Sequence, residues 1–204
     1  MHLIPTQEEV LTLLKETGAL RDGHFLYSNG LHATEYLQVA LAMRYSQVAR
    51  TLSVGLSRLL RENTEIRAMI PELSVVAPAT GGLPVAYGVC EALRAKQVYW
   101  AEKEVEGGPM QFRQFLDVKK GEKVLLVDDI LRTGAKLKML KKLVEDAGGE
   151  VVALAVMVYQ PNPGCADFSP LPLYYLAKLD GMYHMDEASC EQCKQGEPLV
   201  KVLV

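Results

Sequence analysis

From residue 73 to residue 178 the chain alternates short apolar runs with longer amphipathic segments. The runs have the length of strands, and the segments between them repeat their apolar residues at helical spacing. Val124–Val127 is apolar at every position, as in a strand covered on both faces. Strands are predicted at Leu73–Ala77, Gln97–Ala101, Val124–Val127, Val151–Val158 and Leu173–Ala177, and helices at Leu83–Leu93 and Ala135–Ala147. This alternation predicts an α/β fold with a doubly wound parallel sheet.

The first 45 residues follow a different pattern. Thr6-Gln7-Glu8-Glu9 has the form of a capping box and predicts a first helix that ends near Gly18. Turn residues at Tyr27–Gly30 and the partly alternating run Glu35–Val39 then indicate a strand or a hairpin. We expect residues 1–45 to form a small hood over an edge of the core.

The core is expected to span residues 46–178 and to begin with an amphipathic helix at Ser46–Leu60. Residues 179–204 are mostly polar, contain two cysteines and end in an apolar run. They are predicted to form a C-terminal appendage that packs back onto the body.

Composition narrows the class of partner. The chain has 204 residues, 49% of them hydrophobic, and a net charge of -3 with four scattered histidines. This balance offers no basic stripe to a nucleic acid or an anionic membrane, so small-molecule partners are favoured. No apolar run reaches the ~18 residues of a spanning helix, and the first residues lack the layout of a signal peptide. A cytoplasmic protein with reduced cysteines is expected.

The segment Val124–Gly134 carries the clearest chemical signal. A buried strand runs into Asp128 and Asp129, and a Thr133-Gly134 loop follows and opens a helix. A helix N-terminus presents unpaired amides and a positive partial charge, so this loop favours a phosphate. The two acids would repel a bare phosphate unless they face sugar hydroxyls or a magnesium ion. A phosphorylated ribose satisfies both requirements, whereas the alternative is a strand that ends in a solvated acidic turn.

These residues resemble the signature of the type I phosphoribosyltransferases, which bind 5-phosphoribosyl-1-pyrophosphate (PRPP) with magnesium (Mg2+). The resemblance implies that Asp128 and Asp129 contact the ribose and stabilise its developing charge. It assigns the 5-phosphate to the loop Arg132, Thr133, Gly134, Ala135 and Lys136. Arg132 departs from the family pattern, which has Thr or Ser there, and Lys136 lies where a small hydroxyl residue is usual. The loop is therefore more cationic than in most members.

Two further segments extend the resemblance. Ala77–Gly82 looks like the pyrophosphate loop of orotate phosphoribosyltransferases, so Thr80, Gly81 and Gly82 are expected to hold pyrophosphate, unless this is a tight turn that merely needs glycines. Gly23–His32 is similar to the hood of that family. A phosphoribosyltransferase-like fold follows, together with a homodimer whose lids reach across to the neighbour.

Between the two loops, Ala101–Arg113 is polar and glycine-rich, as in a lid. Lys103 and Arg113 are candidates for neutralising charge on the departing pyrophosphate, and the alternative is a solvated hairpin. The resemblance matches the pair Lys103-Glu104. A lysine and a histidine that follow in many members are absent.

The acceptor base is less constrained. Orotate enzymes commonly carry an Asp-Arg pair, whose arginine meets orotate, where this chain has Tyr159-Gln160. The resemblance favours transfer of the phosphoribosyl group to orotate, which gives orotidine 5'-monophosphate and pyrophosphate. The alternatives are the same reaction with another nucleobase and a PRPP-binding regulator that does not catalyse.

The C-terminal appendage offers a candidate metal site. Cys190 and Cys193 have the CxxC spacing of half a zinc (Zn2+) site, with His184 as a third ligand and Cys165 as a conceivable fourth. The alternative is a pair of reduced cysteines in a packed tail. Cys90 is expected in the core. His24 and His32, in the hood, are either contacts to the base or ordinary turn histidines.

Overall fold

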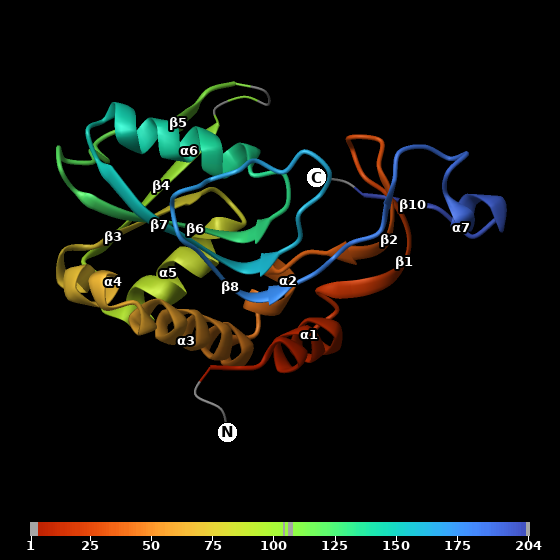
Figure 1. Cartoon of the computed structure of the whole chain (residues 1–204), viewed down its shortest axis with the longest axis horizontal. Helices are drawn as coiled ribbons and strands as arrows, with labels where there is room; N and C mark the ends of the chain where they lie inside the picture. Colours follow the sequence, from red (N-terminus) through yellow and green to blue (C-terminus); the bar gives the residue numbers. More distant parts are fainter. Residues whose placement is uncertain (1–3, 104, 106–107, 203–204) are drawn as a thin grey trace.

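The computed structural model describes residues 4–103, 105 and 108–202. Figure 1 shows a broad α/β body and a smaller sheet beside it. The strands of the body are β3 (Ser74–Pro78), β4 (Gln97–Lys103), β5 (Met110–Phe112), β6 (Lys123–Leu131), β7 (Glu150–Tyr159) and β8 (Leu173–Lys178). They form one sheet in the order β5-β4-β3-β6-β7-β8, in which every neighbouring pair is parallel except β4 and β5.

Helices cover both faces of this sheet (Figure 1). The helices that pack on its strands are α1 (Gln7–Glu16), α3 (Ser46–Glu62), α5 (Gly82–Leu93) and α6 (Ala135–Asp146). The shorter helices α2 (Ala40–Met43) and α4 (Thr64–Met69) pack against other helices, and a 3-10 turn follows at Ile70–Glu72. Successive side chains of β6 point to opposite faces: Leu125 and Val127 join the hydrophobic cluster under α3 and α5, whereas Val124 and Leu126 join the one under α6. The predicted doubly wound sheet is confirmed.

The predicted helix N-terminus at Thr6 is also confirmed. The Glu9 amide donates to Thr6 Oγ1 at 3.2 Å, and the Thr6 amide donates to Glu9 Oε2 at 2.8 Å. The capping box therefore satisfies two amides that would otherwise lack partners at the start of α1.

Strand β6 is longer than its apolar run. It was predicted to end at Val127, but its pairing with β7 continues to Leu131, opposite Tyr159. Asp128 and Asp129 therefore lie inside a strand and not in a turn after it. A central strand can hold such acids at its carboxyl end, where parallel sheets bind ligands.

The smaller sheet joins the two ends of the chain. Its strands are β1 (Leu20–Leu26), β2 (His32–Leu37), β9 (Tyr183–His184) and β10 (Val200–Lys201), in the order β10-β1-β2-β9. The hairpin β1–β2 is the predicted hood, and β9 and β10 come from the C-terminal appendage, which also holds α7 (Glu191–Lys194). Hood and appendage thus share one sheet, in which the C-terminal strands pair with the exposed edges of the hairpin.

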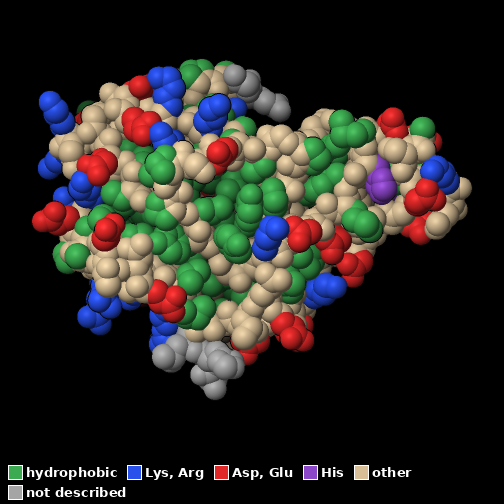
Figure 2. Space-filling view, viewed as in Figure 1, with side chains coloured by type: hydrophobic (Ala, Val, Ile, Leu, Met, Phe, Trp, Pro, Cys, Tyr) green, Lys and Arg blue, Asp and Glu red, His purple; other side chains and the backbone are tan. Residues whose placement is uncertain are grey.

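The surface carries both signs of charge. On the face shown in Figure 2, Lys and Arg side chains alternate with Asp and Glu around the rim of the body. Within the described residues, no helix is long and apolar enough to cross a membrane.

Candidate active site

A cavity of about 510 Å³ lies where the carboxyl end of the body sheet faces the hood. Its lining comes from both parts of the molecule: Tyr27, Ser28, Asn29, Leu31, Tyr36, Leu37, Gln38 and Ala40 from the hood side; Thr80, Gly81, residues 128–137 and Asn162 from the body; Tyr183 and Val202 from the C-terminal segment. The site is therefore built at the edge where parallel sheets place their ligands.

The two acids of β6 occupy the floor of this cavity. Asp128 is buried, with 6% of its surface exposed, and its Oδ1 accepts a hydrogen bond from the Asp129 amide at 2.9 Å. Asp129 Oδ1 accepts from the Ile130 amide at 2.9 Å and is more exposed. These bonds fix both carboxyl groups against the strand and leave oxygens to face a ligand.

Burial raises the pKa of Asp128 well above its ordinary value, and the neighbouring Asp129 carboxylate raises it further, while Lys136 acts in the opposite direction. A buried carboxylate beside a second one is unfavourable until a cation or a hydrogen-bond donor arrives. This pair is accordingly suited to sugar hydroxyls and a divalent cation.

The loop after β6 is shaped for an anion. Gly134 adopts a left-handed conformation (φ 74°), and Thr133 Oγ1 accepts from the Ala135 amide at 3.2 Å. Helix α6 begins at Ala135, so its first amides and Lys136 border the cavity. Phosphate binding is a regular property of such a helix N-terminus.

The second glycine loop packs directly against the acids. A Cβ placed on Gly81 would lie 3.1 Å from Asp129 Oδ2, and one on Gly82 would lie 3.1 Å from Asp128 Oδ1. A side chain at either glycine would push the acids away by a few tenths of an ångström, so glycine favours this close approach. Thr80 and Gly81 line the cavity, and the peptide between Ala79 and Thr80 is cis. The structure thus brings the predicted pyrophosphate loop beside the predicted ribose site.

Comparison with known proteins agrees with this geometry. Residues 47–167 match the family model described as a phosphoribosyl transferase domain. This chain is 36% identical to the orotate phosphoribosyltransferase of Carboxydothermus hydrogenoformans, over 95% of each chain. It is 34% identical to the orotate phosphoribosyltransferase of Thermotoga maritima, over 93% of this chain and 94% of that one. This chain is a phosphoribosyltransferase.

Solved structures agree with the assignment. A phosphoribosyltransferase from Corynebacterium diphtheriae matches with a TM-score of 0.62 and 28% identity, over 85% of this chain and 96% of that one. An orotate phosphoribosyltransferase from Aeropyrum pernix shares the fold, with a TM-score of 0.66 at 22% identity, over 83% of this chain and 93% of that one.

Arg132 takes a position that the sequence did not suggest. Its Nε and Nη2 donate to Gln160 Oε1 at 3.1 and 3.0 Å, and Nη2 also donates to the Leu37 carbonyl at 3.3 Å. The guanidinium carbon lies 4.8 Å from the centre of the Tyr27 ring. The side chain was predicted with the phosphate loop, but its contacts hold it between the body and the hood, across the cavity.

The two predicted lid cations lie elsewhere. Lys103 ends β4 and is exposed, and Arg113 is ion-paired with Glu102 on the β4–β5 hairpin. The described residues that line the cavity do not include either of them. Glu104, the second member of the predicted pair, lies outside the described residues.

Sequence reasoning missed several cavity residues of this phosphoribosyltransferase. Tyr27, Tyr183 and Asn162 line the cavity, and Asn162 Oδ1 is buried with no hydrogen-bond partner in the described part of the chain. Burial raises the pKa of Tyr183 to about 12, despite the lowering effect of Arg132. Its phenol therefore stays protonated at neutral pH. The turn at Tyr27–Gly30 was visible in the sequence, but Tyr183 carries no local signal.

A second cluster lies in the small sheet, where His24, His32, Cys190 and Cys193 form a group that could hold a metal ion. The two cysteines were predicted as ligands. His184 and Cys165, predicted beside them, are not in this group, and His184 lies opposite His32 in the pairing of β2 with β9. The hairpin brings His24 and His32 to the cysteines from more than 150 residues away, a proximity that no local spacing reveals.

Proposed function

We propose that this phosphoribosyltransferase is an orotate phosphoribosyltransferase. It transfers the 5-phosphoribosyl group of PRPP to a ring nitrogen of orotate and releases pyrophosphate. The observation that carries the proposal is a single cavity in which two acids, a phosphate loop and a guanidinium face one another. Relatives that bear this name match over nearly the full length of the chain.

Each part of PRPP has a counterpart in the cavity. The amides at the start of α6, with Thr133 and Lys136, bind the 5-phosphate. Asp128 and Asp129 accept hydrogen bonds from the ribose hydroxyls, and Thr80 and the Gly81-Gly82 amides hold pyrophosphate. The close approach of Gly81 to Asp129 keeps the ribose and pyrophosphate positions adjacent.

The acid pair also fits a magnesium ion, because two carboxylates at one edge offer the oxygen ligands that this ion prefers. Bound with PRPP, magnesium would draw charge from the pyrophosphate and ease its departure. During transfer the C1–O bond to pyrophosphate breaks with its electron pair while the C1–N bond forms. Asp128 and Asp129 stabilise the positive charge that develops on the ribose.

Arg132 is the residue that we assign to the base. Orotate is a pyrimidine with a carboxylate, and a guanidinium binds a carboxylate through two parallel hydrogen bonds. Gln160 occupies the position where the resemblance predicts an arginine, and its Oε1 accepts from Arg132, which directly follows the neighbouring strand β6. The cation is thus supplied from β6 instead of β7. Asn162 Oδ1 offers an unused acceptor for a ring N–H.

The test is pyrophosphate release from magnesium-PRPP with orotate, uracil, adenine and guanine, for the wild type and Arg132→Gln. We expect activity with orotate in the wild type. We expect Arg132→Gln to raise the KM for orotate about 10- to 100-fold, since a charge-assisted pair contributes about 1.5–3 kcal/mol. The dissociation constant of PRPP should change little.

A different preferred base would support the second candidate, a phosphoribosyltransferase for another acceptor. No release with any base, together with PRPP binding, would support a regulator. Lys142→Gln, on the exposed face of α6, is the control for the loss of one positive charge and should leave the KM for orotate unchanged.

The proposal includes a homodimer in a cytoplasmic location. Lys103 closes over the pyrophosphate of the neighbouring chain, with Arg113 beside it. This is supported by the position of both residues on a hairpin apart from the cavity of their own chain. The cytoplasm fits thiols that are unpaired throughout the described residues.

A further inference from the structure

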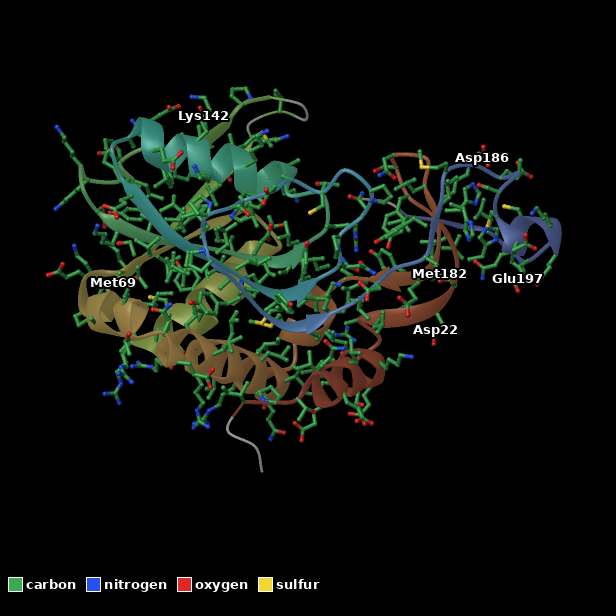
Figure 3. All side chains as sticks on the ribbon, viewed as in Figure 1. Asp22, Met69, Lys142, Met182, Asp186 and Glu197 are labelled. Atoms are coloured by element: carbon green, nitrogen blue, oxygen red, sulfur yellow. The ribbon has the colours of Figure 1, made fainter. Side chains whose placement is uncertain are left out.

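The four clustered side chains come from distant parts of the sequence. His24 lies on β1 and His32 on β2, while Cys190 precedes α7 and Cys193 lies within it. His24, His32 and Cys190 are buried, with exposed fractions of 3%, 6% and 0%. Helix α7, which carries Cys193, lies at the end of the small sheet that is remote from the body (Figure 1), and Glu197, which contacts His24, is labelled at the same end in Figure 3. It does not belong to the phosphoribosyltransferase cavity.

The distances match those of a tetrahedral centre. Zinc binds sulfur at about 2.3 Å and nitrogen at about 2.0 Å, so its ligand atoms stand about 3.3–3.8 Å apart. Here His24 Nε2 lies 3.2 Å from His32 Nδ1, and Cys193 Sγ lies 3.3 Å from both nitrogens. Cys190 Sγ lies 3.4 Å from His24 Nε2, and all four atoms are within 4.8 Å of one another.

The ring of His24 is oriented by a carbonyl group. His24 Nδ1 is 3.1 Å from the backbone oxygen of Glu197, which can only accept a hydrogen bond. This contact places the ring proton on Nδ1 and turns the lone pair of Nε2 toward the cluster. A histidine that ligates a metal is normally held in this way through its other nitrogen.

Hydrogen bonds alone leave one close contact without a proton. Cys190 Sγ–H can donate to His24 Nε2 and Cys193 Sγ–H to His32 Nδ1, but the two ring nitrogens then face each other at 3.2 Å with a lone pair on each. The group lies in the protein interior, where polar atoms without partners are unfavourable. A cation is the one species that all four electron pairs can bind at once.

We propose that His24, His32, Cys190 and Cys193 bind one zinc ion, and that this centre fastens the C-terminal segment to the hood. Two sulfur and two nitrogen ligands in a tetrahedron favour zinc over magnesium or calcium, which prefer oxygen. With four protein ligands no position is open for substrate, so the centre is structural.

The centre has a consequence for the cavity. The chain between Asp180 and Val202 pairs with the hood through β9 and β10, which have two residues each. Tyr183 and Val202, which line the cavity, lie at or next to these short strands. Zinc therefore stabilises the positions of Tyr183 and Val202 in the cavity without lying in the cavity itself.

The experiment uses the full chain, purified under reducing conditions, stripped with a chelator and reloaded with zinc chloride alone. We expect about one zinc per chain in the wild type, and less than about 0.1 in Cys193→Ser and in His24→Asn. Cys165→Ser and His184→Gln are the matched controls, since both residues lie outside the group, and should keep about one. Cobalt in place of zinc should give the visible absorption of a tetrahedral site and a thiolate charge-transfer band.

Should the ligand variants fail to fold, the wild type alone decides. Chelation should lower its melting temperature and make the segment after Asp180 sensitive to protease, and zinc, but not magnesium, should reverse both effects. The proposal is overturned if the reloaded wild type holds no zinc. It is equally overturned if a soluble Cys193→Ser variant holds as much zinc as the wild type.

Discussion

The position of Asp128 favours ligand binding but lowers the free energy of unfolding. Its carboxyl group is buried beside Asp129, and the pKa is raised above that of the same group in the unfolded chain. The folded state therefore favours the protonated form. As the pH rises through the ordinary range of a carboxyl group toward the folded pKa, this group ionises in the unfolded chain but stays protonated in the folded one, so the apo protein loses stability across that range.

We predict that Asp128→Asn stabilises the apo protein at neutral pH by about 1 kcal/mol, or about 2–4 °C in melting temperature. Asparagine cannot ionise, and its Oδ1 can still accept from the Asp129 amide. The difference in stability between Asp128→Asn and the wild type should decrease as the pH is lowered, because the Asp128 carboxyl group of the wild type then becomes protonated and uncharged in both the folded and the unfolded chain. Turnover with magnesium-PRPP should fall about 10²- to 10³-fold. Differential scanning fluorimetry across pH and a pyrophosphate-release assay measure both effects.

The control for this substitution is Asp146→Asn, which removes an exposed carboxylate paired with Lys142 and should alter neither property appreciably. A lower melting temperature for Asp128→Asn at neutral pH, or wild-type turnover, would contradict the assignment.

At the scale of elements, the loop between β6 and α6 depends on one backbone conformation. Gly134 has φ 74°, and a Cβ there would lie 2.9 Å from Ala166 Cβ and 3.0 Å from Phe168 Cε2. The turn that directs the first amides of α6 toward the cavity is thus packed closely against the segment after β7. Any side chain at this position strains the backbone and also displaces the loop.

We predict that Gly134→Ala lowers the stability by about 1–3 kcal/mol and weakens PRPP binding at least about 10-fold. Gly121→Ala is the matched control: φ is 77° there as well, but no atom lies within 4 Å of the added Cβ. Gly121→Ala should lose only the stability that the strained backbone costs, and its dissociation constant for magnesium-PRPP should be that of the wild type. Calorimetric titration with magnesium-PRPP compares the two, and equal affinities would show that the loop tolerates the shift.

The elements also show what the sequence could and could not predict. Apolar runs and glycine loops predicted every body strand except β5, and the helices α1, α3, α5 and α6, to within a few residues, because each depends on local pattern and burial. Strand β6 passes Val127 because its ladder with β7 continues, which is a tertiary effect. Strands β9 and β10, of two residues each, exist only through pairing with the hood. The positions of His24, Arg132 and Tyr183 depend on such long-range contacts.

At the scale of the whole molecule, the body provides the acids and the glycine loops of the cavity, and the two ends of the chain provide the rest of its lining. Hood and C-terminal segment form one sheet that covers the cavity, and Figure 1 shows this sheet beside the body. The β4–β5 hairpin, in contrast, carries Lys103 outside the cavity of its own chain. The proposed homodimer, in which this hairpin acts on a neighbouring copy, accounts for this position.

We predict that Lys103 acts across a homodimer, and complementation between two inactive variants tests it. Lys103→Ala and Asp128→Asn should each have little activity alone. In a heterodimer purified with two tags, one site combines intact acids from one chain with Lys103 from the other, so about half of the wild-type activity should return. If Lys103 acted within its own chain, both sites would stay defective and no activity would return. Lys120→Ala, an exposed lysine on another loop, should be fully active by itself. A monomer in light scattering would also refute the prediction.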